Sequence, residues 1–230
     1  MVTHVQVRGG IIPTTLCIFV KTALPGLVKT RLSPPLSAAE AASLAAAFFE
    51  DTLAAATAGE WARVVVACDG DPALLGLSAD TTIWPQGAGD LGERMERVLS
   101  LALECSDAVI AIGTDSPGLP RVFLDSARQL LGEHDAVIGP CEDGGFYLLG
   151  LRRCPAELLR GLPWSVATTR ERMVERLFSA GLSVAETGQW FDVDRPTDLD
   201  RLAFLLRAEC IYAPRTARLL AELAPIRRWP

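Results

Sequence analysis

Short apolar runs rich in Val and Ile recur along the chain, separated by longer stretches in which apolar residues repeat every three or four positions. Several runs are apolar at successive positions rather than at alternate ones, which is typical of strands covered by helices on both faces. The pattern predicts strands at residues 15–20, 62–68, 81–85, 107–113, 135–140, 145–151 and 182–187.

The stretches between these runs carry helix-start signals. Ser37–Glu40 has the spacing of a capping box and opens a long Ala-rich segment that Gly59 closes. Thr168–Glu171 predicts a second box, and Asp90–Glu93 can act similarly. Strands that alternate with helices predict an α/β fold with three layers, α/β/α, around a mostly parallel sheet.

The expected organisation is one domain with short additions at both ends. Residues 15–212 show no repeat, low-complexity tract or linker and predict a single domain. Residues 1–14 are expected to be a flexible N-terminal segment. Residues 213–230 predict an amphipathic helix, closed by Pro225, that packs on the domain or on a partner subunit of a homodimer.

Composition narrows the class of protein. The chain has 230 residues, 50% of them hydrophobic, which is enough for a substantial core. Its formal net charge is −6, without a block of like charges, so nucleic acid is not expected as a partner. Charges, Gly or Pro interrupt every apolar run well short of a membrane span, and no signal-peptide pattern is present, so a cytoplasmic location away from membranes is expected.

Cysteine and histidine usage excludes several kinds of site. The six cysteines are scattered without a C-x-x-C pair, which predicts reduced thiols. Only His4 and His134 are present, too few for a histidine-rich metal site and poorly placed for a serine-histidine triad. Carboxylates, hydroxyls and cations must therefore carry any chemistry.

A basic loop follows the first predicted strand. The stretch KTALPGLVKTRL places Lys21, Lys29 and Arg31 around a flexible Gly26, a combination that can hold a phosphate. It is not a mononucleotide P-loop, because no Gly directly precedes Lys29. Alone, such a stretch is more often a solvated loop, but ligands of open α/β sheets collect beyond the carboxyl ends of strands, where this loop is expected.

Carboxylates follow two other strands. Asp115 comes shortly after the run DAVIAIG, in TDSPGLP. There it needs a cation such as Mg²⁺ as a partner, or else it or Ser116 caps the next turn; the two interpretations weigh equally. In DVD, Asp194 is the favoured second metal ligand over Asp192, with helix capping as the alternative.

Three further stretches are weaker candidates. Asp143–Gly144 is a favoured hairpin turn, and the following Gly145 lets a ligand approach the backbone. Gln86 and the glycines after it suit contacts with a base or ribose. Trp164 either lines an acceptor pocket or fills the core, and the core role is the favoured interpretation.

Taken in order, the segments KTALPGLVKTRL, GDLGERM, IGTDSPGLP, GPCEDGGFYLLGL, PWS and FDVDRPTDL resemble a bacterial family of nucleotide-diphospho-sugar transferase type, over roughly residues 16–206. Members are often labelled glycosyltransferase, some in connection with arsenosugar biosynthesis. The pattern is more distantly similar to molybdenum-cofactor nucleotidyltransferases and phospholactate guanylyltransferases. The resemblance implies a GT-A fold with the nucleotide over the first half of the sheet.

The resemblance also implies roles for matching positions: phosphate contacts from Lys21, Lys29 and Arg31, metal binding by Asp115 and Asp194, and an acceptor bordered by Gly144–Gly145. The chain departs from the family at Ala23, Leu27, Ser116 and Val166, and Val166 affects the acceptor side. The candidate catalytic residues are Lys29, Arg31 and Asp115, and Mg²⁺ or Mn²⁺ is expected at Asp115 and Asp194. The residues expected to bind the nucleotide are Lys21, Gly26, Lys29, Arg31, Gln86 and Gly89. Those expected to bind the acceptor are Asp143, Gly144, Gly145, Trp164 and Ser165.

The sequence thus predicts a metal-dependent transferase that uses a nucleotide donor and a small-molecule acceptor. The basic loop favours nucleotidyl transfer from a nucleoside triphosphate to a phosphorylated acceptor, because departing pyrophosphate must be neutralised. The alternatives are a glycosyltransferase that uses a nucleotide-sugar and a nucleotide-binding module with a decayed site. Glu142 and Asp143 are the candidates for a general base.

Overall fold

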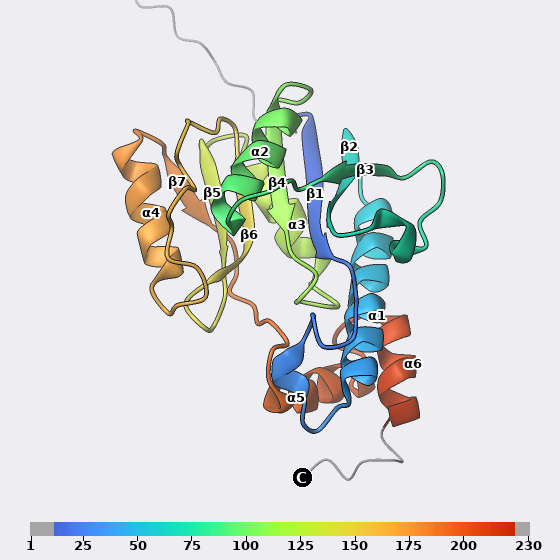
Figure 1. The fold of residues 1–230 in the computed structure, drawn as a ribbon. Coiled ribbons are helices and arrows are strands. Elements are labelled where there is room, and N and C mark those ends of the chain that lie inside the picture. Colours follow the sequence, from blue (N-terminus) through green and yellow to red (C-terminus); the bar gives the residue numbers. More distant parts are fainter. Residues whose placement is uncertain (1–11, 224–230) are drawn as a thin grey trace, which may run out of the picture.

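Seven strands form one sheet in the order β3-β2-β1-β4-β6-β5-β7 in the computed structural model, which describes residues 12–223 (Figure 1). Each strand overlaps one of the predicted apolar runs, and the predicted α/β fold class is confirmed. The strands are β1 (Thr14–Lys21), β2 (Arg63–Asp69), β3 (Thr82–Pro85), β4 (Ala108–Ile112), β5 (Ala136–Pro140), β6 (Phe146–Leu151) and β7 (Val184–Glu186).

The direction of β6 decides which segments meet. It runs antiparallel to both neighbours, β4 and β5, whereas the other neighbouring pairs are parallel. The carboxyl ends of the other six strands therefore share an edge with the start of β6. The loops after β1, β2, β3 and β4 and the turn between β5 and β6 all gather at this edge, where ligands of open α/β sheets bind.

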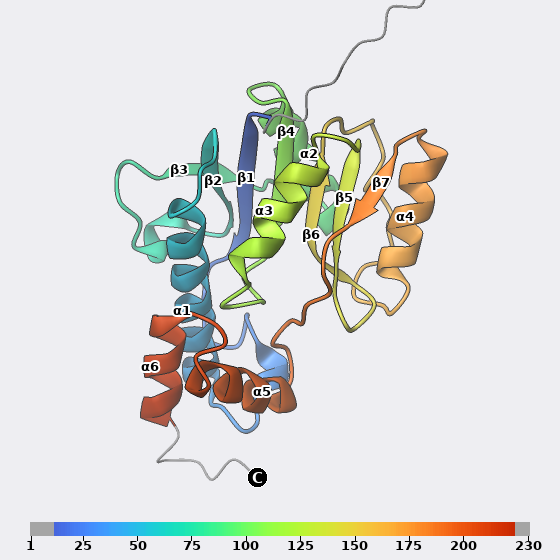
Figure 2. The same cartoon turned by 180° about the vertical axis from the view of Figure 1, so that it is seen from behind.

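Helices cover both faces of the sheet (Figures 1 and 2). One hydrophobic cluster packs α2 and α4 on one face, and a second packs α1 and α3 on the other, which completes the three predicted layers. The helices are α1 (Ala38–Thr57), α2 (Leu91–Leu103), α3 (Arg121–Leu130), α4 (Thr169–Ser179), α5 (Pro196–Arg207) and α6 (Pro214–Leu223), with short 3-10 turns η1 (Thr30–Leu32) and η2 (Pro72–Leu75).

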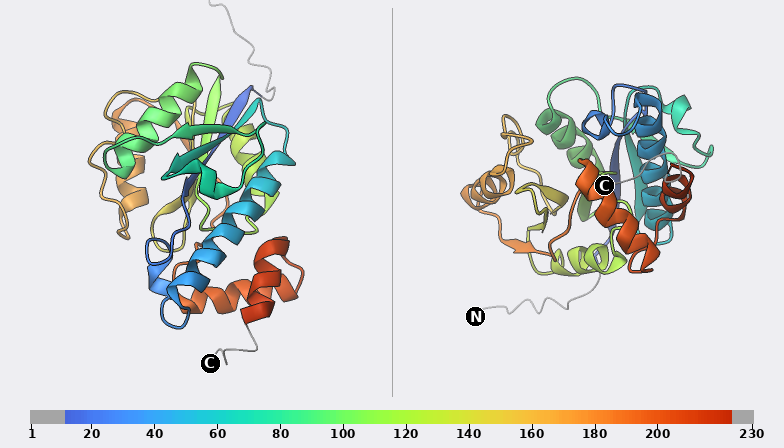
Figure 3. Two further views of the ribbon diagram at one scale, coloured as in Figure 1. Left: turned by 45° about the vertical axis from the view of Figure 1, so that its right-hand side comes forward. Right: turned by 90° about the horizontal axis from the view of Figure 1, so that it is seen from below.

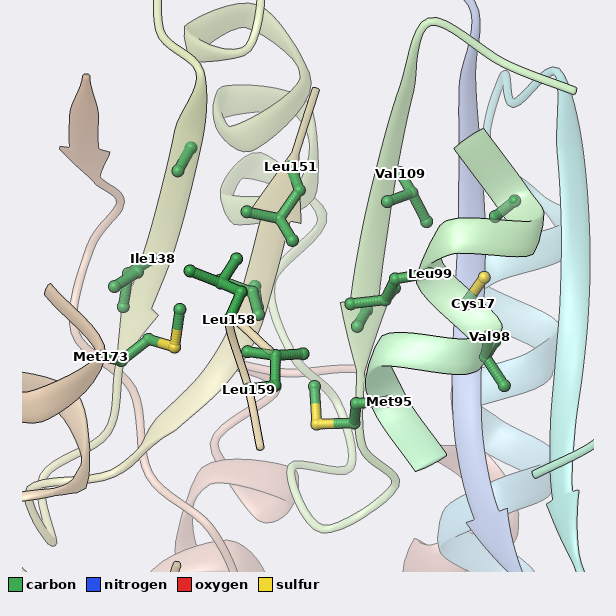
Figure 4. Packing of buried hydrophobic residues seen from close by; sticks show 14 of the residues in the cluster. Cys17, Met95, Val98, Leu99, Val109, Ile138, Leu151, Leu158, Leu159 and Met173 are labelled. Atoms are coloured by element: carbon green, nitrogen blue, oxygen red, sulfur yellow. The ribbon is translucent and has the colours of Figure 1, made fainter. Parts of the chain in front are cut away.

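The face beneath α2 shows why its sequence forms an amphipathic helix. Met95, Val98 and Leu99 recur at helical spacing and point at the sheet, where Cys17 of β1 and Val109 of β4 meet them (Figure 4). Fully burying a side chain such as that of Leu99 contributes about 1.5–3 kcal/mol. This packing fixes the start of α2 against the carboxyl edge of the sheet.

Two of the predicted capping boxes are confirmed, at Ser37–Glu40 for α1 and Asp90–Glu93 for α2. The box predicted at Thr168–Glu171 is wrong, because the side chain of Thr168 makes no capping bond. Loop carbonyls take its place, since Val166 O accepts from the amide of Thr169 at 3.0 Å and Gly144 O accepts from that of Arg170 at 3.0 Å.

A third packing region lies beyond the carboxyl edge, where α5 and α6 sit below the sheet next to the lower part of α1 (Figure 3). Leu32 after the basic loop and Val193 before α5 are both fully buried in it. This region therefore ties the basic loop to the segment that carries Asp192 and Asp194.

The terminal predictions are only partly covered by the described residues. The predicted tail helix begins as expected and runs from Pro214 to Leu223, but Pro225 and the other residues beyond 223 lie outside the described part, as do residues 1–11 of the segment expected to be flexible. The division into a domain at 15–212 and flanking segments stays a prediction. Within residues 12–223, no helix combines the length and the apolarity that a membrane crossing requires.

One buried carboxylate anchors α6 to α1. Asp51, whose side chain is 1% exposed, accepts hydrogen bonds from the backbone amides of Arg215 at 3.1 Å and Thr216 at 2.8 Å. These amides belong to the first turn of α6, whose donors have no partner within the helix.

We predict that Asp51→Ala lowers the free energy of unfolding by roughly 2 kcal/mol, because two buried amides lose a charged acceptor. Urea denaturation would measure the change. Glu50→Ala is the matched control: Glu50 is half-exposed and pairs with the Arg215 guanidinium at 2.8 Å, so its loss is expected to cost about 0.5 kcal/mol. Equal losses for the two variants would contradict the anchoring role.

Candidate functional site

A cleft of about 570 Å³ opens at the carboxyl edge of the sheet. It is lined by the ends of β1 and β4, the start of β6, the basic loop and the first turn of α2. Most of the residues predicted from sequence line it. They are Lys21, Lys29, Arg31, Gln86, Asp115, Asp143, Gly145, Trp164, Ser165 and Asp194.

The other three predicted residues, Gly26, Gly89 and Gly144, are not among those that line the cleft, and the backbone explains them. All three have positive φ, which favours glycine. A Cβ on Gly89 would collide with the side chain of Glu93 in the α2 capping box, and one on Gly144 would collide with the carbonyl of Ala167. Close packing, rather than the approach of a ligand, is the visible reason for glycine at these two positions.

Lys29 is the centre of the site. Its ammonium donates to Asp115 Oδ1 at 2.7 Å, to Asp194 Oδ1 at 2.9 Å and to the carbonyl of Val193 at 2.8 Å. The side chain is only 7% exposed. Since an ammonium has three N–H donors, all of them have partners.

Electrostatics keep this lysine charged. Burial alone would lower the pKa of Lys29, but the negative charges of Asp115 and Asp194 outweigh it and raise the pKa above 10.5. The carboxylates themselves remain open to the cleft, with the side chains of Asp115 51% and Asp194 40% exposed. The site therefore holds a buried cation between two accessible carboxylates.

The contacts of the two aspartates differ from the capping role that the sequence offered as an alternative, and metal binding by them stays a prediction. Asp115 faces Lys29 instead of capping the following turn. Helix α5 is capped by Asp198, which accepts from the amides of Asp194 at 3.0 Å and Arg195 at 2.7 Å, so the side chain of Asp194 is available to the cleft. Asp115 and Asp194 are thus the two carboxylates that converge on one cation.

Asp192 also lines the cleft but has a different environment. Its Oδ1 accepts from the hydroxyl of Ser116 at 2.5 Å. Burial, assisted by the nearby charge of Asp115, raises the pKa of Asp192 to about 6, although the Ser116 bond opposes the shift. Asp192 therefore changes its charge closer to neutral pH than an ordinary carboxyl does.

Two exposed cations of the cleft, Lys21 and Arg31, have few contacts with carboxylates. Lys21, at the end of β1, is exposed and has no ion pair or side-chain hydrogen bond within residues 12–223. The Arg31 guanidinium is 65% exposed, and its nearest carboxylate contact is a long one, 3.8 Å to Asp194 Oδ2. Both can reach an anion in the cleft without leaving a buried partner.

The opposite end of the cleft contains Gln86. Its amide nitrogen donates to the carbonyls of Val20 at 3.2 Å and Ala67 at 2.9 Å. Because both partners are acceptors, the nitrogen must face the strands, and the side-chain oxygen points away from them. Beside it, Asp69 accepts from Arg94 at 2.7 Å.

Sequence reasoning missed Asp69 and Arg94, although both line the cleft. The signal was present for Asp69, which follows the apolar run of β2 in the same way that Asp115 follows β4. Arg94 lies in the first turn of α2, where it was visible only as part of the stretch GERM.

The predicted acceptor side is aromatic. The rings of Phe146 and Trp164 meet edge to face with centroids 5.8 Å apart, so Trp164 both lines the cleft and packs on the core. Asp143 accepts from the amide of Gly145 at 2.8 Å. Glu142 is not among the lining residues and makes a two-pronged ion pair with Arg201 at 2.6 and 2.9 Å, which lowers its pKa, so of the two candidate bases only Asp143 faces the cleft.

The residues present fit a divalent cation. Two carboxylates already converge on one positive group, and hard cations such as Mg²⁺ use one or two carboxylates together with phosphate oxygens and water. Within residues 12–223 no group of three or more His, Cys, Asp or Glu residues forms a complete metal cage. Asp115 and Asp194 would therefore need a ligand's oxygens to complete the coordination.

Comparison with known proteins finds a bacterial protein family and solved structures of similar fold. The family model described as "Uncharacterized protein conserved in bacteria (DUF2064)" matches residues 52–166. A candidate nucleotide-diphospho-sugar transferase from Desulfovibrio desulfuricans G20 is 32% identical, with a TM-score of 0.81, over 92% of this chain and 95% of that one. These matches confirm the resemblance and the GT-A fold.

Two more distant structures show the fold alone. CMP:2-keto-3-deoxy-manno-octonic acid synthetase, complexed with CTP, is 14% identical, with a TM-score of 0.54, over 86% of this chain and 99% of that one. Glucosyl-3-phosphoglycerate synthase from Mycobacterium tuberculosis, complexed with Mn²⁺, UDP and glucosyl-3-phosphoglycerate, is 13% identical, with a TM-score of 0.51, over 95% and 81%. No curated protein matches the chain.

The pKa of Asp192 gives a pH-dependent prediction. Between about pH 4 and pH 6 the folded protein binds a proton that the unfolded chain has released, so Asp192 makes the fold less stable as the pH rises through this window. We expect Asp192→Asn to raise the free energy of unfolding by up to roughly 2 kcal/mol at pH 8 and by little at pH 4, because Asn keeps an oxygen for Ser116.

Urea denaturation at both pH values, in metal-free buffer, would measure this difference. Asp80→Asn, at an exposed loop position, is the control and should change stability equally at pH 4 and pH 8. A variant at Asp192 that is less stable than the wild type at pH 8 would show that its charge is needed by the fold.

Proposed function

The chain belongs to the bacterial family DUF2064, and we propose that it is a Mg²⁺- or Mn²⁺-dependent nucleotidyltransferase that moves a nucleotidyl group from a nucleoside triphosphate to a small phosphorylated acceptor. The observation that carries this proposal is the convergence of Asp115 and Asp194 on one cation beside the exposed cations Lys21 and Arg31. Carboxylates for a metal and cations for phosphates are what binding a metal-polyphosphate requires.

In the proposed reaction, an oxygen of the acceptor phosphate forms a bond to the α-phosphorus, the bond from that phosphorus to the bridging oxygen breaks, and pyrophosphate leaves with the electron pair. Negative charge then grows on the departing β-phosphate. Lys21 and Arg31 line the cleft and would bind and stabilise that charge. Because the acceptor phosphate is already anionic, the reaction needs no general base.

The two aspartates would hold the divalent ion, which when bound would neutralise phosphate charge. Lys29 aligns their Oδ1 atoms by donating to both. At the other end of the cleft, Gln86 presents its side-chain oxygen for the base or ribose. Phe146 and Trp164 offer an aromatic wall to the organic part of the acceptor.

That aromatic wall also supports a second candidate, transfer of a sugar from a nucleotide-sugar, because sugar rings pack well on aromatic side chains. The exposed cations Lys21 and Arg31 favour the first candidate, since in a metal-dependent glycosyltransferase the metal itself neutralises the diphosphate. A decayed nucleotide-binding module is the least supported alternative, because the Lys29 contacts to Asp115 and Asp194 are intact.

A thermal-shift panel tests the proposal by ligand class. With Mg²⁺ present, we expect at least one of ATP, CTP, GTP and UTP to raise Tm by roughly 5 °C or more at saturating concentration, and UDP-glucose and GDP-mannose to raise it less. Stabilisation by nucleotide-sugars alone would favour the glycosyltransferase. A folded protein that responds to neither class would refute both enzyme proposals.

We predict that Asp115→Asn weakens Mg²⁺-dependent binding of the stabilising nucleotide by about tenfold or more, as seen by calorimetry, because the metal loses a charged ligand. Asn keeps an oxygen for Lys29, so the fold should persist. The control is Asp125→Asn, a half-exposed position on α3 whose carboxylate pairs with Arg121. Unchanged metal dependence in Asp115→Asn would remove that residue from the metal site.

A further inference from the structure

The ammonium of Lys29 stands at the point where a metal would be needed. Its three donors are taken up by Asp115 Oδ1, Asp194 Oδ1 and the carbonyl of Val193, all within 2.9 Å. The two carboxylates are the ones that the proposed function gives to a divalent ion. In this structure a cation of the protein itself therefore holds the position.

Positive neighbours reduce the attraction of Asp115 and Asp194 for a free metal ion. The negative charges of Asp115 and Asp194 are balanced by Lys29, buried between them, and by Arg31, whose guanidinium lies 3.8 Å from Asp194. A divalent cation that approached the same oxygens would be repelled by the ammonium at close range. A triphosphate changes this balance, because it adds several negative charges and new acceptors for Lys29.

The backbone of Lys29 suits an exchange of partners. The residue has φ 47° and ψ 37°, a left-handed conformation at the start of η1 that aims the side chain at the aspartates. The next turn is fixed by Leu32, which is fully buried. The four-carbon stem of lysine can therefore swing while the main chain stays in place.

We propose that Lys29 is a placeholder for the metal ion: it occupies the position between Asp115 and Asp194 in the free protein and gives it up only when polyphosphate arrives. This inference rests on the proposed function. Its consequence is ordered recognition, in which the divalent ion enters together with the phosphates and not before them. The site then does not retain a metal ion in the absence of its nucleotide.

Calorimetry with Mn²⁺ alone tests the placeholder. We expect Lys29→Met, which keeps the length of the side chain and removes its charge, to bind Mn²⁺ at least tenfold more tightly than the wild type without nucleotide. Lys21→Met is the matched control. Lys21 lines the same cleft and makes no ion pair with either aspartate within residues 12–223, so this variant should bind Mn²⁺ as the wild type does. No gain in Lys29→Met would overturn the inference.

A second measurement needs no variant. The chain contains only two lysines, Lys21 and Lys29, so ¹⁵N labelling of lysine gives at most two ammonium signals. The hydrogen-bonded, buried Lys29 should give a persistent signal, whereas exposed Lys21 should exchange with water and broaden. Mg²⁺ alone should leave the Lys29 signal in place, and Mg²⁺ with an equimolar mixture of ATP, CTP, GTP and UTP should move it.

These outcomes separate the inference from the proposed function. A Lys29 signal that Mg²⁺ alone moves as far as Mg²⁺ with nucleotides would overturn the placeholder and leave the transferase proposal standing. If the nucleotide mixture never binds but Lys29→Met gains Mn²⁺ affinity, the transferase proposal fails and the competition between Lys29 and metal is upheld.

Discussion

The site depends on a single buried ammonium. Lys29 joins segments that are far apart in sequence, since its partners Val193 and Asp194 lie 164 and 165 positions away and Asp115 belongs to a third segment. Leaving such a charge buried without partners would be costly, so the segments must come together for the lysine to be tolerated. The same requirement aligns the two carboxylates that face the cleft.

Strand order makes this meeting possible. Central strands β1 and β4 are neighbours, so the basic loop after β1 and the Asp115 loop after β4 leave the sheet side by side. The third segment arrives from β7, at the far edge of the sheet, and is brought back by the packing of Val193 in the region formed by α1, α5 and α6. The terminal helices thus support the site although they contribute no side chain that lines the cleft.

The strands of the sheet and most residues of the cleft could be predicted from the sequence. The features that could not be predicted were missed for physical reasons. Apolar runs reveal buried strands, and a carboxylate close after the end of a buried strand needs a partner, which is why Asp115 could be found. Asp194 lies well beyond the end of β7 at Glu186, and the short apolar pair before DVD and the family resemblance indicated it instead. The reason for each glycine was harder to predict. A glycine required by close packing, such as Gly144 against Ala167, looks the same in sequence as a glycine required by the approach of a ligand. The pairing of Lys29 with its aspartates was invisible, since it depends on distances across the fold.

The choice of lysine over arginine at the centre follows from geometry. Of the 22 Lys and Arg residues in the chain, only Lys21 and Lys29 are lysines, and both belong to the stretch KTALPGLVKTRL. Three acceptors, one from each of Asp115, Asp194 and Val193, surround a single nitrogen atom of Lys29. A compact ammonium with three donors fits that arrangement, whereas a planar guanidinium is a larger group and spreads its donors over a fork. The position between the two carboxylates suits one small cation. A small divalent ion can therefore occupy it when the ammonium of Lys29 has left.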